Sequence, residues 1–187
     1  LVTPTHFLSE IKEAVKIRRP NIPIVYNTHG YEREECLKEA DEFVDVYLPD
    51  LKYFSQKAAQ RYTGISDYFE VASNAVLHMM NAKKTVLENG LMTSGVCVRH
   101  LILPMNLAET CNIIEWFSQN RKNGAYFSLM AQYTPFGDIE NYPELKRPIT
   151  AREYNIACDK LLSCGFEECF IQERSSSSKK FIPDWDF

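Results

Sequence analysis

Nine residues, DVYLPDLKY at 45–53, constrain the fold of this chain more than any other segment. The apolar run over 44–48 predicts a buried strand. Pro49 ends the run, and Asp50 and Lys52 follow two residues apart, on the same side of an extended chain. A buried parallel strand that ends in an acid and a base is typical of the functional rim of an α/β barrel.

Strand-like runs alternate with helical patterns along most of the chain. This alternation predicts a parallel sheet with right-handed crossovers, and 187 residues can bury one sizeable core. We therefore predict an α/β fold, a partial TIM-like (β/α) barrel with parallel strands over 1–172, followed by a tail over 173–187. The expected strands are 22–27, 44–48, 96–103, 125–130 and 168–171.

The number of expected strands leaves the barrel incomplete. Five strands are too few to close an eight-stranded barrel, and the first would be an exposed edge, preceded only by a strand stub at the start of the chain. We therefore expect this chain to be a fragment that lacks N-terminal βα units.

Periodicity and capping residues place helices between the strands. A long helix is expected to begin near Ser66 and to end at Asn89 and Gly90, because Asn and Gly commonly end helices. Thr150 and Glu153 form a capping box for a later helix. Further helices are expected over 7–17, over 32–40 and after 106, with a short helical turn over 55–61.

Polar side chains follow the ends of several expected strands. Because the C-terminal ends of parallel strands share one rim, these side chains should converge, as in a barrel active site. The rim candidates are Asn27, Thr28, His29, Asp50, Lys52 and Tyr133.

Arg99 and His100 are neighbours within one expected strand, so one side chain should face the barrel interior and the other the helix layer. An arginine in the interior needs an anionic partner, which Asp50 or a carboxylate-bearing ligand can supply. The pair of Asp50 and Lys52 is equally compatible with a solvated ion pair that has no further role.

Composition and missing motifs exclude several classes of function. The net charge is -4 and basic residues are dispersed, so no nucleic-acid partner is expected. Apolar runs are too short to span a bilayer and no signal peptide opens the chain, so we expect a soluble, cytoplasmic protein without a membrane partner. The six cysteines are scattered and should be reduced, and no HxH, HxxxH, GxSxG, Walker or GxGxxG motif occurs. We assign no metal ligand.

Four segments carry a resemblance to a known family. YNTHGY at 26–31, DVYLPDLKY at 45–53, VRHLILP at 98–104 and LMAQYTP at 129–135 occur in this order with helices between them, and the opening LVTPTH also fits. Together they resemble the radical S-adenosylmethionine superfamily, in particular proteins related to pyruvate formate-lyase activating enzyme. The resemblance covers nearly the whole chain.

The resemblance implies a site for S-adenosylmethionine at the rim. It places Asp50 and Lys52 against the amino-acid end of this ligand, Arg99 toward its carboxylate, and the turn at 27–28, Asn27 and Thr28, nearby. Such a zwitterion needs an acid for its ammonium group and a base for its carboxylate. Tyr133 would lie beside the nucleoside, where its ring can stack or its hydroxyl can bond.

The implied activity is cleavage of S-adenosylmethionine at a [4Fe-4S] cluster, followed by hydrogen abstraction by the 5′-deoxyadenosyl radical. The family's CxxxCxxC and GGE motifs do not occur here, so the cluster ligands would lie outside this chain and the chain alone should be inactive. The implied partners are an electron donor and a glycyl-radical protein or another substrate. Asn27 stands where the family often has aspartate and Tyr133 where it has histidine, which weakens the glycyl-radical expectation more than the ligand site.

Two alternatives stay open on the sequence. A barrel hydrolase or lyase could use Asp50, Lys52 and His100 without a cluster. A non-enzymatic docking module could bind a partner through FIPDWDF at 181–187.

Overall fold

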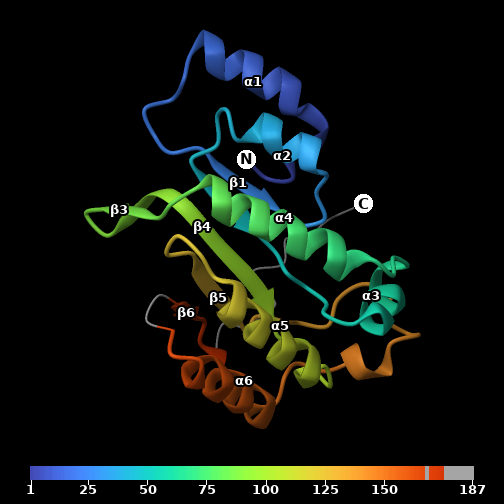
Figure 1. Cartoon of the computed structure of the whole chain (residues 1–187). Coiled ribbons are helices and arrows are strands. Elements are labelled where there is room, and N and C mark those ends of the chain that lie inside the picture. Colours follow the sequence, from blue (N-terminus) through green and yellow to red (C-terminus); the bar gives the residue numbers. More distant parts are fainter. Residues whose placement is uncertain (167–168, 175–187) are drawn as a thin grey trace.

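The computed structural model describes residues 1–166 and 169–174 (Figure 1). In chain order its elements are η1 (Pro4–Phe7), α1 (Leu8–Ile17), β1 (Val25–Thr28), α2 (Glu34–Ala40), β2 (Val46–Pro49), α3 (Gln56–Thr63), α4 (Tyr68–Ala82), β3 (Val86–Glu88), β4 (Leu91–Leu101), α5 (Leu107–Asn120), β5 (Tyr126–Met130), η2 (Pro143–Leu145), α6 (Ala151–Ser163) and β6 (Cys169–Ile171).

The five expected strands form one sheet in the order β1-β2-β4-β5-β6, and every neighbouring pair is parallel. This confirms the predicted α/β fold with parallel strands. The parallel strands are arranged in the sheet in the same order as in the chain, as in a (β/α) barrel. Right-handed crossovers between them then place the helices on one face of the sheet. Figure 1 shows α4 and α5 lying across that face.

The two faces of the sheet differ sharply in burial. Tyr26, Tyr47 and Phe127 are fully buried on the helix-covered face, in the main hydrophobic core. Their chain neighbours on the other face, such as Asn27 and Leu48, are only half-buried. Since side chains alternate along a strand, this difference sets which residues can meet a ligand.

The opening residues partly cover the edge of β1. Val2 pairs in parallel with Asn27, and the Thr3 amide donates to the Asn27 carbonyl at 2.8 Å. The expected strand stub is therefore part of the sheet, and it leads into α1.

One sequence prediction was wrong. The helix expected to reach 89–90 ends at Ala82, and an antiparallel hairpin of β3 and β4 follows, so β4 begins at Leu91 rather than at Val96. Asn89 and Gly90 both have positive φ, 52° and 79°, which suits a two-residue hairpin turn. An Asn-Gly pair is common both at helix ends and in hairpin turns, and here the pairing of β3 with β4 makes it a hairpin turn.

Other predicted elements are present, although β1 begins at Val25 rather than at 22 and β2 at Val46 rather than at 44. The helical turn expected over 55–61 is α3, and the Ser55 hydroxyl accepts from the Ala58 amide at its start. The capping box of Thr150 and Glu153 opens α6. The expected last strand is β6, whose predicted first residue lies outside the described residues, and the domain boundary near 172 stays a prediction.

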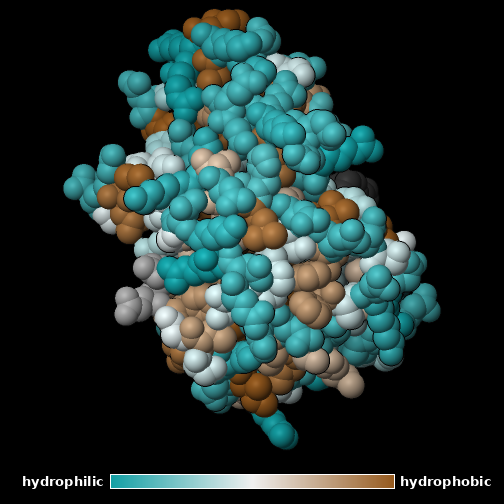
Figure 2. All heavy atoms as spheres, in the orientation of Figure 1, coloured by the Kyte–Doolittle hydropathy of each residue, from teal (hydrophilic) through white to brown (hydrophobic). Residues whose placement is uncertain are grey.

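The hairpin carries apolar side chains into solvent. Val86, Leu87 and Leu91 are exposed, and Figure 2 shows an apolar patch where Figure 1 places the hairpin. No helix in the described part of the chain is long and apolar enough to cross a membrane.

We expect Gly90→Ala to loosen the hairpin. A Cβ at this position meets no atom within 4 Å, so the cost, about 1 kcal/mol, comes from the positive φ alone. Amide hydrogen exchange in β3 should accelerate. Gly137→Ala, at a similar φ of 78° in a loop, is the control and should leave β3 unchanged. Unaltered exchange in Gly90→Ala would contradict this account of the turn.

Candidate functional site

The rim is built by sheet hydrogen bonds that continue past the end of β2. Pro49 has no N–H, yet the Asp50 amide donates to the Thr28 carbonyl at 2.9 Å and the Leu51 amide donates to the Arg99 carbonyl at 2.8 Å. Asp50 is thereby fixed between β1 and β4. The prediction that strand ends converge at one rim is confirmed for these three strands.

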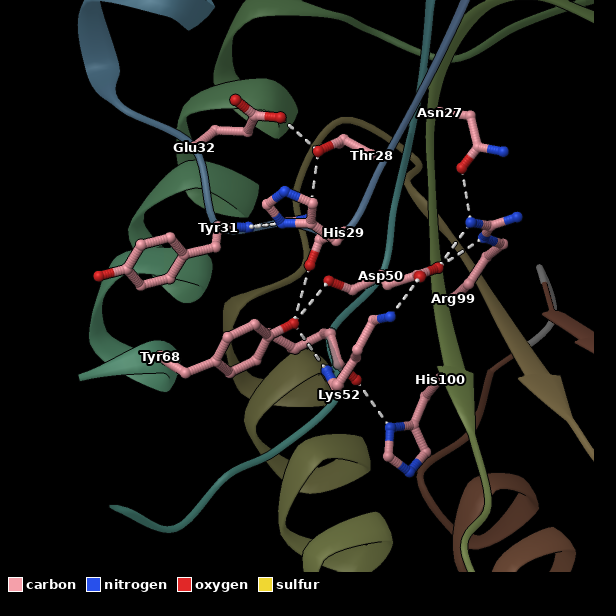
Figure 3. A network of polar contacts seen from close by, with 12 residues as sticks. Asn27, Thr28, His29, Tyr31, Glu32, Asp50, Lys52, Tyr68, Arg99 and His100 are labelled. Carbon is pink, nitrogen blue, oxygen red and sulfur yellow. Dashed lines mark hydrogen bonds and ion pairs between the residues drawn. The ribbon is translucent and has the colours of Figure 1, made fainter. Parts of the chain in front are cut away.

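Asp50 is the centre of a charged network (Figure 3). Arg99 Nε donates to Asp50 Oδ1 at 2.8 Å, and Lys52 Nζ lies 3.3 Å from Asp50 Oδ2. Arg99 also donates to Asn27 Oδ1 at 2.6 Å. The Asp50 side chain is 18% exposed and the Arg99 side chain 22%, so the pair of Asp50 and Arg99 is shielded from solvent more than a surface pair is. The Lys52 side chain is 42% exposed, and its pair with Asp50 is partly solvated.

A hollow of about 270 Å³ adjoins this network. Three charged side chains lie on its lining, and three aliphatic side chains, one aromatic ring and one amide form the rest. Such a mixture suits a ligand with a zwitterionic end and a less polar body. The lining residues are Asp50, Lys52, Tyr53, Arg99, Leu101, Leu103, Met130 and Gln132.

Tyr68, the first residue of α4, makes hydrogen bonds to the backbone of the rim. Its hydroxyl donates toward the carbonyls of His29 (2.9 Å) and Asp50 (3.2 Å) and accepts from the Lys52 amide at 3.1 Å. Glycine at position 30 lets the Asp50 carbonyl lie close to the turn after β1, since a Cβ there would lie 2.1 Å from the carbonyl oxygen. The backbones of both strand ends are thus tied to one phenol.

Glu109 anchors the segment that follows. One carboxylate oxygen accepts from the Phe54 amide at 2.7 Å and from the Ser55 amide at 2.8 Å. Neither Glu109 nor Tyr68 belongs to the site residues predicted from the sequence. Both lie on helices distant along the chain, and no local pattern marks a side chain that will bind backbone elsewhere.

His100 faces the helix layer, opposite to Arg99, as predicted for adjacent strand residues. Its Nδ1 lies 2.7 Å from the Leu51 carbonyl and its Nε2 lies 2.9 Å from the Thr110 hydroxyl. A carbonyl only accepts, so Nδ1 carries the proton and Nε2 accepts from Thr110. Burial lowers the pKa of His100 to about 4, which keeps the ring neutral.

Two of the implied site residues use their hydroxyl groups outside the hollow. The Thr28 side chain turns to the helix-covered face, where its hydroxyl donates to Glu32 and accepts from the Gly30 amide at 3.2 Å. The Tyr133 hydroxyl donates to the Leu145 carbonyl at 2.7 Å, and its neighbour Gln132 lines the hollow instead. Asn27, Asp50, Lys52 and Arg99 are the implied residues that meet.

Within residues 1–166 and 169–174, no group of three or more His, Cys, Asp or Glu side chains could hold a metal ion. The six cysteines, all among the described residues, form no disulfide, and burial raises the pKa of Cys97 to about 11. The described residues therefore do not fit an iron–sulfur cluster.

We expect Tyr68→Phe to destabilise the protein by about 1–3 kcal/mol, because buried backbone groups lose their hydroxyl partner. Denaturant unfolding measures the change. Tyr142→Phe is the control, since its hydroxyl makes one bond, to the Arg61 carbonyl at 3.2 Å, and should cost less. Equal losses of stability in the two variants would contradict the proposed role of the Tyr68 hydroxyl.

The lowered pKa of His100 predicts a pH dependence of stability. Between pH 6.5 and 4 the unfolded state binds a proton that the folded state does not, so the free energy of unfolding should fall as pH falls, by up to about 3 kcal/mol. Above pH 6.5 this contribution is complete. Unfolding of His100→Gln, which keeps a donor and an acceptor, should lack this component, and an identical pH profile would contradict it.

The sequence and the fold of this chain are similar to those of known proteins. No protein-family model matches the chain. Over 158 residues, 83% of this chain, it is 28% identical to the uncharacterized protein MJ0674 of Methanocaldococcus jannaschii, of which it covers 43%. A crystal structure of a domain of pyruvate-formate lyase-activating enzyme from Bacteroides vulgatus superimposes with a TM-score of 0.65 at 12% identity, covering 91% of this chain and 94% of that one.

The chain spans less than half the length of its relative, and the likeness to the solved structure concerns the fold alone. This protein is thus a distant homologue of the Methanocaldococcus protein, with a fold like that of a domain of a pyruvate-formate lyase-activating enzyme.

Proposed function

We propose that this chain supplies the S-adenosylmethionine-binding rim of a radical S-adenosylmethionine protein related to glycyl-radical activating enzymes. The observation that carries the proposal is one carboxylate, Asp50, held between two cations, Arg99 and Lys52, beside a hollow at the ends of parallel strands. Rigid strand ends of this kind can position a charged ligand closely.

The charges suit the amino-acid end of S-adenosylmethionine. In this proposal Asp50 accepts hydrogen bonds from the ligand's ammonium group, while Arg99 and Lys52 donate to its carboxylate. Arg99 and Lys52 are each paired with Asp50, so ligand binding would exchange partners without leaving a buried charge unpaired. Asn27 keeps the guanidinium of Arg99 oriented during this exchange.

The remaining implied residues have supporting roles. Thr28 shapes the turn at Gly30 through its hydroxyl rather than by contacting the ligand. The ring of Tyr133 is proposed to meet the nucleoside, with its hydroxyl engaged by the Leu145 carbonyl. Tyr53 and Met130 line the less polar part of the hollow, where the body of the ligand would lie.

When bound, the [4Fe-4S] cluster would supply the electron that cleaves S-adenosylmethionine to the 5′-deoxyadenosyl radical. Its ligands would come from outside the described residues, which hold no suitable group. An electron donor and a glycyl-radical protein, or another substrate, are the partners proposed for the longer protein, acting in the cytoplasm.

The alternatives are less well supported. His100 points to the opposite face from Asp50, is 2% exposed and has both ring nitrogens bonded, so a hydrolase or lyase site of Asp50, Lys52 and His100 is not assembled. The segment proposed for docking, 181–187, lies outside the described residues.

Binding of S-adenosylmethionine, measured by isothermal titration, tests the proposal. We expect saturable binding that Asp50→Asn and Arg99→Lys each weaken at least about tenfold, because a charge-assisted or bidentate contact is lost. In the longer protein loaded with its cluster, the same variants should lose release of 5′-deoxyadenosine.

The control is Asp45→Asn. Asp45 lies just before the opposite end of β2, and its carboxylate also pairs with an arginine, Arg19, at 2.7 Å. This variant removes an equivalent ion pair far from the hollow and should bind S-adenosylmethionine normally. Absence of saturable binding, or an equal loss in Asp45→Asn, would refute the proposed site.

A further inference from the structure

A second hollow, of about 340 Å³, lies between α2 and α4 on the helix-covered side of the sheet. One wall comes from the start of α2 and the residues just before it, and the other from the middle of α4. It shares no lining residue with the hollow at Asp50. We call it the α2–α4 groove.

Glu32 lines this groove and is an unusual acid. It is 4% exposed, and Oε1 accepts from the hydroxyls of Thr28 and Thr5, the latter at 2.9 Å. Oε2 is buried and has no hydrogen-bond partner among the described residues. Figure 3 shows this oxygen pointing away from Thr28. A buried carboxylate oxygen without a donor is costly, so a donor from outside the chain would be strongly favoured.

The lining of the groove combines acidic and aliphatic side chains. Glu34 and Glu35 are exposed at its mouth, where Arg33 is the only arginine or lysine among its lining residues. Glu34 pairs with Lys38 at 2.6 Å, which leaves Glu35 as the freer acid. The histidine of the lining, His78, already has a partner, since its Nε2 lies 2.8 Å from Asp41 Oδ2.

The aliphatic wall of the groove consists of Leu37, Val71 and Ala75. These aliphatic side chains can cover an alkyl chain but offer it no hydrogen bond. A metal ion does not suit the site, since no group of three metal-binding side chains exists among the described residues.

We propose that the α2–α4 groove binds a short aliphatic diamine, with one ammonium group donating to Glu32 Oε2 and the other held near Glu35. The alkyl chain lies against the aliphatic wall. Oε2 is closed off in the free chain, so the exposed side chains of Arg33 and Asn74 move aside as the ligand enters. The inner ammonium then forms a charge-assisted hydrogen bond away from water, which is stronger than one at the surface.

Titration calorimetry with 1,4-diaminobutane tests this site. We expect saturable binding of the diamine, weaker binding of 1-aminobutane and none of the neutral 1-butanol. Glu32→Gln, which replaces the buried anionic group by a neutral amide, should weaken diamine binding at least about tenfold. Glu39→Gln, on α2 but outside the groove, is the matched control and should bind as the wild type does.

A second variant keeps the test independent of the fold around Glu32. Asn74→Phe fills the groove from its exposed rim and should block the diamine. Asp50→Asn should leave diamine binding intact, which separates this site from the proposed S-adenosylmethionine rim. No saturable diamine binding, or undiminished binding in Glu32→Gln and Asn74→Phe, would overturn the proposal.

Discussion

The position of Asp50 depends on two backbone hydrogen bonds, and the rest of the rim depends on Asp50. Its own amide is tied to β1 and the next amide to β4, so the chain remains in the sheet after Pro49 has ended β2. A residue held in this way can place a carboxylate beside Arg99 without the entropy loss of ordering a mobile loop. Tyr68 adds hydrogen bonds from the helix layer to the same backbone.

The core side chains and the polar groups of the rim lie on opposite faces of the sheet. Tyr26, Val98 and Phe127 are fully buried on the face that the helices cover. On the other face, residues one position away in sequence, including Asn27 and Arg99, remain half-buried and carry the polar groups. His100 belongs to the first face. It stabilises the fold as a neutral ring bonded to backbone and hydroxyl, although the sequence analysis also considered it for catalysis.

Asp50 and Glu32 are both shielded from solvent, but their carboxylates have different partners. Asp50 is paired with cations that a ligand could replace, whereas Glu32 accepts hydroxyl groups at one oxygen and leaves the other without a donor. The sequence places Glu32 only at the start of an expected helix. Its environment arises because Thr5 and Thr28 come together from separate elements.

Much of the fold could be predicted because its signals are local. The period of apolar residues and the caps specified the parallel strands and most helices, and the strand ends indicated that Asp50, Lys52 and Arg99 would meet. The Asn-Gly pair at 89–90 forms a hairpin turn and not the predicted helix end. Its local sequence is compatible with both structures, and only the pairing of β3 with β4 distinguishes them.

The sequence by itself determined which residues alternate between faces and which polar groups lie at strand ends. These properties follow from strand geometry, which repeats every two residues. The tertiary structure alone decided that Tyr68 and Glu109 bond the backbone of the rim, that the hydroxyls of Thr28 and Tyr133 bond outside the hollow, and that Glu32 is enclosed. These outcomes depend on the distances between elements that are far apart in the chain, and no local pattern encodes such distances.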